Sequence, residues 1–150
     1  MRIAIGSDHI GYPLKCKVKE YLESRGHAVQ DFGADGEQRT DYPLYGLRVA
    51  QAVAGGACEL GVLICGTGIG ISLAANKVPG VRAAVCSEPY SARMARAHND
   101  ANIIAFGARV VGEGMAEEIV DAFMQTAFEG GRHLERVRMM DAIQRGERIG

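Results

Sequence analysis

One stretch of the sequence indicates the fold class of this protein, and it reads Leu60-Gly61-Val62-Leu63-Ile64-Cys65-Gly66-Thr67-Gly68-Ile69-Gly70. Its first six residues are almost all apolar, as is typical of a parallel strand that is buried on both faces. The three glycines that follow predict a tight turn whose backbone amides can approach a ligand closely. Because a helical segment comes next, the stretch indicates a strand–turn–helix unit of an α/β protein.

Four other short apolar runs alternate with segments of helical period along the chain. They cover residues 3–5, 28–32, 82–86 and 103–106. The first helical segment carries an apolar stripe at Leu14, Val18 and Leu22 and is ended by Gly26. The prolines at positions 13, 43 and 89 lie where helices should begin, because a proline in the first turn sacrifices no internal hydrogen bond.

A last helical segment follows the break at Gly130-Gly131, with apolar residues at every third position and arginines on its other faces. The apolar residues are Leu134, Val137, Met140 and Ile143. We therefore predict a single domain, residues 1–150, with a Rossmann-like three-layer α/β/α sandwich, a parallel sheet of about five strands and a C-terminal helix. Ligands of such folds bind beyond the carboxyl ends of the strands, so the turns after the strands are the places to search.

Length and charge exclude several classes of protein. The chain has 150 residues, with 17 lysines and arginines against 18 aspartates and glutamates, so its net charge is 17 − 18 = −1. Nucleic-acid binding depends on an excess of basic groups, which this chain lacks. No uninterrupted apolar run exceeds four residues, which excludes a membrane-spanning helix. The length suits one domain better than separate cofactor and substrate domains.

The N-terminus and the cysteines indicate the compartment. The chain starts directly in a strand-like pattern, without the long apolar stretch of a secretory signal. Its cysteines form neither a CxxC pair nor the dense framework of a small disulfide-rich domain. We therefore expect a cytoplasmic protein in which all four are reduced thiols, namely Cys16, Cys58, Cys65 and Cys86.

Two of the turns carry side chains that suit chemistry. Asp8 and His9 follow the first strand and present a carboxylate and an imidazole side by side; the alternatives are a helix cap and a solvated ring. Cys65 ends the third strand before the glycine turn, where the amides at a helix N-terminus favour a thiolate. The alternative for Cys65 is a buried side chain that acts as a small hydrophobic residue.

The glycine turn also matches part of the fingerprint of dinucleotide-binding proteins. A G-x-G-x-x-G pattern that begins at Gly66 needs glycine or alanine at position 71, where this chain has Ile71. Glu88, about 20 residues further along, would then accept a hydrogen bond from the ribose. Because the pattern is incomplete and no room remains for a substrate domain, nucleotide binding is the weaker interpretation.

Polar residues near the fifth strand are further candidates. His98 and Asn99 lie at the end of the helix before that strand, where polar residues can also simply terminate a helix. Arg109 follows the strand and places a guanidinium on the expected ligand-binding edge. Guanidinium groups hold phosphate with fixed bidentate geometry, so this edge suits a phosphorylated ligand.

The final helix supplies two more arginines. Arg132 and Arg136 are four residues apart and share one face, either as a phosphate clamp or as a solvated face. His133 lies between them, and we expect it to be solvated. Taken together, the thiol, the imidazoles and the arginines are expected to converge at one edge of the sheet.

Several short motifs carry more information in their joint order and spacing than any one of them alone. They are Gly6-Ser7-Asp8-His9, Arg39-Thr40-Asp41-Tyr42-Pro43, Cys65-Gly66-Thr67-Gly68-Ile69-Gly70-Ile71-Ser72, Ala74-Ala75-Asn76-Lys77, Cys86-Ser87-Glu88-Pro89-Tyr90, His98-Asn99-Asp100, Phe106-Gly107-Ala108-Arg109 and Glu129-Gly130-Gly131-Arg132-His133. Together these motifs resemble the ribose-5-phosphate isomerase type B family, which includes allose-6-phosphate and galactose-6-phosphate isomerases. The resemblance runs from Met1 through the final helix.

This resemblance implies an aldose–ketose isomerase that works without a metal or an organic cofactor, through ring opening and an enediolate. Cys65 would be the base that moves a proton between C1 and C2, His98 the acid that assists ring opening, and Thr67 a group that holds the oxyanion. The implied substrate-binding residues are Asp8, His9, Tyr42, Gly66, Gly68, Ile69, Gly70, Asn99, Arg109, Arg132 and Arg136. Among these, Asp8 would contact the sugar, while the imidazole of His9 and the three arginines would hold the phosphate.

The resemblance also implies a choice of base and an assembly. Some members of the family lack the cysteine and use a glutamate at the position of Ile71, so this chain resembles the cysteine branch. A homodimer or dimer of dimers with active sites shared between subunits is implied. The substrate is expected to be ribose 5-phosphate, with a six-carbon sugar phosphate as the alternative. A non-catalytic sugar-phosphate or nucleotide-binding module is the competing class, against which Cys65 and His98 both argue.

Overall fold

The computed structural model describes residues 1–150 and contains one five-stranded parallel sheet with the strand order β2-β1-β3-β5-β4. The strands are β1 (Arg2–Ser7), β2 (Ala28–Asp31), β3 (Leu60–Cys65), β4 (Ala83–Val85) and β5 (Ile103–Gly107). The helices are α1 (Tyr12–Ser24), α2 (Tyr42–Ala54), α3 (Ile69–Ala75), α4 (Pro89–Asn99), α5 (Glu113–Gln125) and α6 (Arg132–Gln144). Each of these helices is too short or too polar to span a bilayer.

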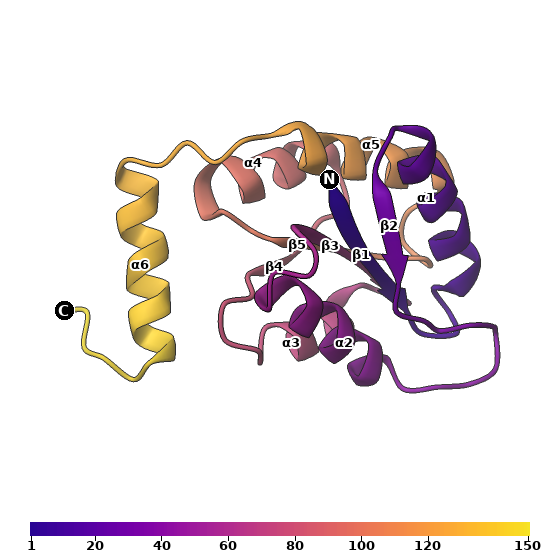
Figure 1. Ribbon diagram of the computed structural model, residues 1–150, viewed down its shortest axis with the longest axis horizontal. Helices are drawn as coiled ribbons and strands as arrows, with labels where there is room; N and C mark the ends of the chain where they lie inside the picture. Colours follow the sequence, from indigo (N-terminus) through magenta and orange to yellow (C-terminus); the bar gives the residue numbers. More distant parts are fainter.

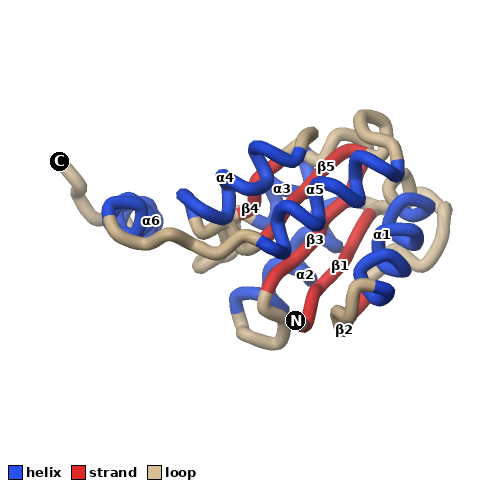
Figure 2. Tube along the Cα trace, turned by 90° about the horizontal axis from the view of Figure 1, so that it is seen from above, coloured by secondary structure: helices blue, strands red, loops and turns tan.

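Helices cover both faces of the sheet, as the apolar strands require. Residues of α1, α4 and α5 form one hydrophobic core with the sheet, and residues of α2 and α3 form the other. Figures 1 and 2 show these helices as two layers with the sheet between them. All six residues of β3 are buried, because this strand lies at the centre of the sheet. The predicted three-layer α/β/α fold with a parallel sheet and a C-terminal helix is confirmed.

The helix boundaries follow the signals in the sequence. Pro13, Pro43 and Pro89 each lie in the first turn of a helix, as predicted. Glu88 caps α4, because its carboxylate accepts a hydrogen bond from the backbone N–H of Ser91 at 2.9 Å. Helix capping therefore explains the acidic residue at position 88, and no bound nucleotide ribose is needed to account for it.

Helix α6 stands outside the three layers, beside α4 (Figures 1 and 2). Only His133 and Val137 of α6 are buried, while Met140 and Ile143 of the same apolar stripe are 41% and 56% exposed. An ion pair between Nη1 of Arg82 and Oδ1 of Asp141, 3.5 Å apart, ties the helix to the segment before β4. The second half of the apolar stripe of α6, Met140 and Ile143, is therefore uncovered within one chain.

Candidate active site

The carboxyl edge of the sheet brings three of the predicted turns together. Ser7 is paired in register with Ile64, and Cys65 with Gly107, so β1, β3 and β5 end side by side. Asp8 follows β1 directly, the glycine turn follows β3, and Arg109 lies two residues beyond β5. The strand register therefore places a carboxylate, a thiol and a guanidinium at neighbouring positions on one edge.

The glycine turn is built closely against the end of β5. Gly68 has a φ of +82°, and a Cβ atom at this position would lie 2.7 Å from the backbone of Phe106. The backbone N–H of Gly68 donates to Sγ of Cys65 at 3.2 Å, and a donor aimed at the sulfur stabilises negative charge there. The N–H of Ile69 donates to Oγ1 of Thr67 at 3.2 Å, which leaves the hydroxyl proton of Thr67 free to be donated.

Asp8 and His9 each have an ordered partner inside the chain. Asp8 is buried, and its Oδ1 accepts a hydrogen bond from the N–H of Gly11 at 3.0 Å, just before α1. This bond closes a turn before α1 and does not cap the helix, since no side chain caps α1, and it leaves the second carboxylate oxygen available. The Nδ1 atom of His9 lies 3.2 Å from both the backbone N and O of Thr40, so the ring is held by the loop before α2 rather than solvated.

Arg109 and Tyr42 both lie against the glycine turn. The backbone N–H of Arg109 donates to the carbonyl of Gly66 at 3.1 Å. A Cβ atom on Gly66 would lie 3.8 Å from Nη1 of Arg109, and one on Gly70 would lie 2.6 Å from Cζ of Tyr42. Both side chains therefore flank the glycine turn that follows Cys65.

His98 and Asn99 lie at the opposite edge of the sheet, so the prediction that all candidates converge at one edge is wrong within a single chain. Helix α4 runs antiparallel to the strands, and its last residues therefore lie near the start of β5. Cys65 is in register with the end of β5. The five residues of β5 separate the two edges by roughly 13 Å, at about 3.3 Å per residue. Arg132 and Arg136 lie on α6, outside the layers.

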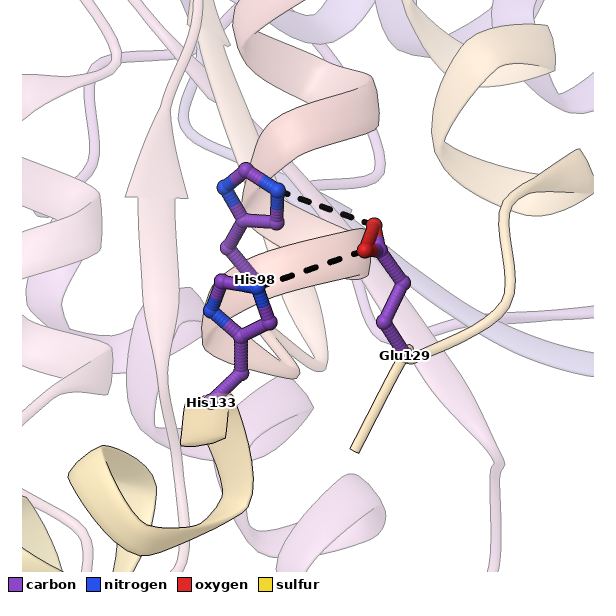
Figure 3. Close-up of side chains that lie close together, drawn as sticks. All are labelled: His98, Glu129 and His133. Carbon is purple, nitrogen blue, oxygen red and sulfur yellow. Dashed lines mark ion pairs between the residues drawn. The ribbon is translucent and has the colours of Figure 1, made fainter. Parts of the chain in front are cut away.

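His133 is buried instead of solvated, which corrects a second prediction. Its ring stacks on that of His98 with the centroids 4.2 Å apart and the planes 8° from parallel. Glu129, on the segment between α5 and α6, lies beside both rings: its carboxylate is 3.6 Å from Nε2 of His98 and 4.0 Å from Nε2 of His133 (Figure 3). Burial lowers the pKa of His133, and the neighbouring His98 and Arg132 lower it further.

The donor set of His98, Glu129 and His133 is the one cluster with the composition of a metal site. A metal ion bound by an imidazole lies near the plane of the ring, about 2.0–2.1 Å from the nitrogen. The two rings are parallel and stacked, so no point near Nε2 lies in both planes. These side chains therefore form a carboxylate-bridged stack that would have to rotate before it could bind a metal.

Sequence reasoning missed the roles of Glu129 and His133, although both lie in a motif that it singled out. No local signal could have found them, because Glu129 precedes α6 and Gly130 and Gly131, both with positive φ, turn the chain between the two side chains. It also missed Thr40, whose backbone orients His9. That contact carries no signal in side-chain chemistry.

The carboxyl edge combines a thiol held by an N–H donor, a buried carboxylate, an imidazole and a guanidinium. Such a set suits an enzyme that moves protons on a small anionic substrate. The sequence matches the family described as Ribose/Galactose Isomerase over residues 3–140. The chain therefore belongs to this family, and the prediction of an aldose–ketose isomerase is confirmed.

Individual relatives agree with this assignment over nearly the whole chain. Ribose-5-phosphate isomerase B of Escherichia coli strain K12 is 54% identical over 143 residues, which cover 95% of this chain and 96% of the relative. The structure of ribose-5-phosphate isomerase B from Clostridium thermocellum is 55% identical with a TM-score of 0.96, covering 97% of this chain and 99% of that one. A galactose-6-phosphate isomerase subunit of Clostridium acetobutylicum is 46% identical, covering 86% of this chain and 75% of the relative.

Proposed function

We propose that this protein interconverts ribose 5-phosphate and ribulose 5-phosphate, with Cys65 as the base and His98 as the ring-opening acid. The observation that carries this proposal is the placement of Cys65, which ends β3 with its sulfur 3.2 Å from the N–H of Gly68 and with Arg109 beside the same turn. The two relatives of highest identity described above are ribose-5-phosphate isomerases B. Both support the five-carbon substrate.

The isomerisation itself is a proton transfer between neighbouring carbons. The Cys65 thiolate takes the proton from C2 of the open-chain aldose, and the electron pair moves to form the enediolate. The thiol exchanges its proton with solvent and then gives a proton to C1, while the hydroxyl proton on O2 moves to O1. The negative charge that develops on oxygen is stabilised by the Thr67 hydroxyl and by backbone amides of the turn.

Ring opening precedes this transfer when the substrate is ribose 5-phosphate. The bond between C1 and the ring oxygen breaks, His98 gives a proton to the ring oxygen, and Asp8 takes the proton of the C1 hydroxyl. Asn99 accompanies His98 at the end of α4. His9 and Arg109, together with Arg132 and Arg136, hold the phosphate, whose binding energy orients the reacting carbons.

A site shared between two subunits reconciles these roles with the positions of the residues. Cys65 and His98 lie at opposite edges of one chain, so one subunit supplies the thiol and another the imidazole and the arginines of α6. Two uncovered apolar surfaces support this pairing. One is the stripe of Met140 and Ile143 on α6. The other is a groove of about 430 Å³ beside the glycine turn, lined by Tyr42, Pro43, Leu47, Gly70, Leu73, Ala74 and Lys77. We therefore propose a homodimer or a dimer of dimers, located in the cytoplasm.

The preferred substrate is tested by measuring kcat/KM on ribose 5-phosphate, allose 6-phosphate and galactose 6-phosphate under one set of conditions. We expect ribose 5-phosphate to have the highest value by about tenfold or more, since one misplaced group in a fitted pocket costs roughly 1–3 kcal/mol. A higher value for either six-carbon substrate would reassign the enzyme. No turnover of any of the three would favour a non-catalytic binding module.

Complementation tests the shared site. Cys65→Ala and His98→Asn should each be nearly inactive, and mixing them under conditions that exchange subunits should restore activity to about a quarter of the wild-type value. In a symmetric dimer, half of the mixed population is the heterodimer, which holds one intact site out of two. Mixing Cys65→Ala with Thr67→Ala, whose residues lie on the same turn, is the matched control and should restore nothing. An absence of recovery in the first mixture, despite demonstrated exchange, would place both residues in one subunit's site.

A further inference from the structure

Three side chains form a stack at the end of α4 that the chemistry above uses only in part. His98 and His133 lie face to face, and Glu129 lies at the Nε2 side of both rings. The other ring nitrogen of each histidine points away from Glu129 (Figure 3). The arrangement therefore gives Nε2 of His98 a carboxylate partner and leaves its Nδ1 on the opposite side of the ring.

We propose that Glu129 and His133 are positioning residues for His98: the carboxylate keeps a proton on Nε2, and the stack fixes the plane of the ring so that Nδ1 faces the substrate. This inference rests on the proposed function, in which His98 protonates the ring oxygen. An acid in this role must carry its proton before the substrate arrives and must hold a single orientation. Neither condition follows from the position of His98 at a helix end alone.

Burial and the charges around the stack disfavour a proton on His133. Two imidazolium ions 4.2 Å apart would repel each other, so a positive charge on both rings is unfavourable. The side chain of His133 is 10% exposed and that of His98 is 40% exposed, so desolvation disfavours the charge on His133. Arg132 and Arg136 disfavour it as well, since they lower the pKa of His133. Burial and the two arginines therefore keep His133 neutral, and the Glu129 carboxylate lies beside Nε2 of the more exposed ring, His98.

Ring opening and the proton transfer between C1 and C2 can be measured separately, because only one of the two substrates has a ring. Ribose 5-phosphate exists mainly as a furanose, whereas ribulose 5-phosphate is open, because its C5 oxygen carries the phosphate and cannot close a five-membered ring. Solvent deuterium incorporation at C1 of ribulose 5-phosphate requires the base and the enediolate but no ring opening. Turnover of ribose 5-phosphate requires both steps.

The test is Glu129→Gln, which keeps the shape of the side chain and removes its charge. We expect turnover of ribose 5-phosphate to fall about tenfold or more, a part of the roughly 10²- to 10⁴-fold that a positioned acid contributes. Deuterium incorporation into ribulose 5-phosphate should remain near the wild-type rate. Glu135→Gln removes an exposed carboxylate from the first turn of α6 and should change neither rate. Equal losses in both measurements, or no loss in either, would overturn the role of Glu129.

The stack is tested separately with His133→Phe and His133→Ala. Phenylalanine keeps a flat ring against His98 and cannot take its proton, so we expect it to retain much more ribose 5-phosphate turnover than alanine does. Equal turnover in the two variants would overturn the role of the stack. Failure of the underlying reaction scheme would look different, because Cys65→Ala would then still incorporate deuterium at C1.

Discussion

Cys65→Ala should lower kcat for ribose 5-phosphate by about 10³-fold, within the roughly 10²- to 10⁴-fold that a general base contributes. The sulfur of Cys65 lies at the start of the glycine turn and receives the backbone N–H of Gly68 at 3.2 Å, so its thiolate is stabilised where the proposed enediolate would form. Alanine leaves Arg109, Asp8 and the turn in place, so substrate binding should be largely intact. Steady-state kinetics together with direct titration of the inactive variant by substrate measures the two quantities separately.

The matched control is Cys86→Ala. Cys86 is also buried, and desolvation raises its pKa to about 11, so it is a neutral thiol at physiological pH. Removing it should leave kcat near the wild-type value. If Cys65→Ala retained near-normal kcat, the base would have to be sought elsewhere on this edge, and the assignment of Cys65 would fail.

Gly68→Ala should destabilise the protein by about 3 kcal/mol or more and should disrupt the active site at the same time. Two costs add at this position. A φ of +82° is unfavourable for any L-residue with a side chain, by about 1–2 kcal/mol. The added Cβ would also lie 2.7 Å from the backbone of Phe106, which cannot move without shifting β5. Chemical denaturation measures the loss in the free energy of unfolding.

Gly80→Ala separates the two costs. Gly80 has a similar φ of +88°, but the nearest heavy atom to an added Cβ is Ala54 Cβ at 4.0 Å. This variant should lose only about 1–2 kcal/mol, the cost of the backbone conformation alone. Equal losses for the two variants would show that the contact with Phe106 is relieved at no cost.

The sequence was sufficient for the fold because each element carried its own local signal. The apolar run of β3, the prolines at helix starts and the glycine turn are all readable from neighbouring residues, and the structure has them where they were predicted. The placement of Cys65, Asp8 and Arg109 followed from one rule about the carboxyl ends of parallel strands.

The prediction that His98 lies at the same edge as Cys65 is wrong within one chain, and the topology of a parallel sheet explains why. A helix that returns to the start of the next parallel strand ends at the amino edge of the sheet, so His98 could not join Cys65 within one chain. The burial of His133 was not predictable in the same way. It depends on the contact between α4 and α6, and a histidine flanked by Arg132 and followed by Glu135 has a local composition typical of a solvated helix face.

Arg132 and His133 are consecutive residues at the start of α6, and in the proposed site this adjacency would let the enzyme tell phosphorylated sugars from free ones. There, a phosphate held by Arg132 would steady the same helical turn that carries the ring stacked on His98. A free pentose has no phosphate for Arg132 to bind. The first turn of α6 would then be held less firmly, and so would the His98 ring that stacks on it. We therefore expect discrimination against unphosphorylated sugars to be stronger in turnover than in binding, since the proposed phosphate ligand and the ring that supports the acid share one turn of α6.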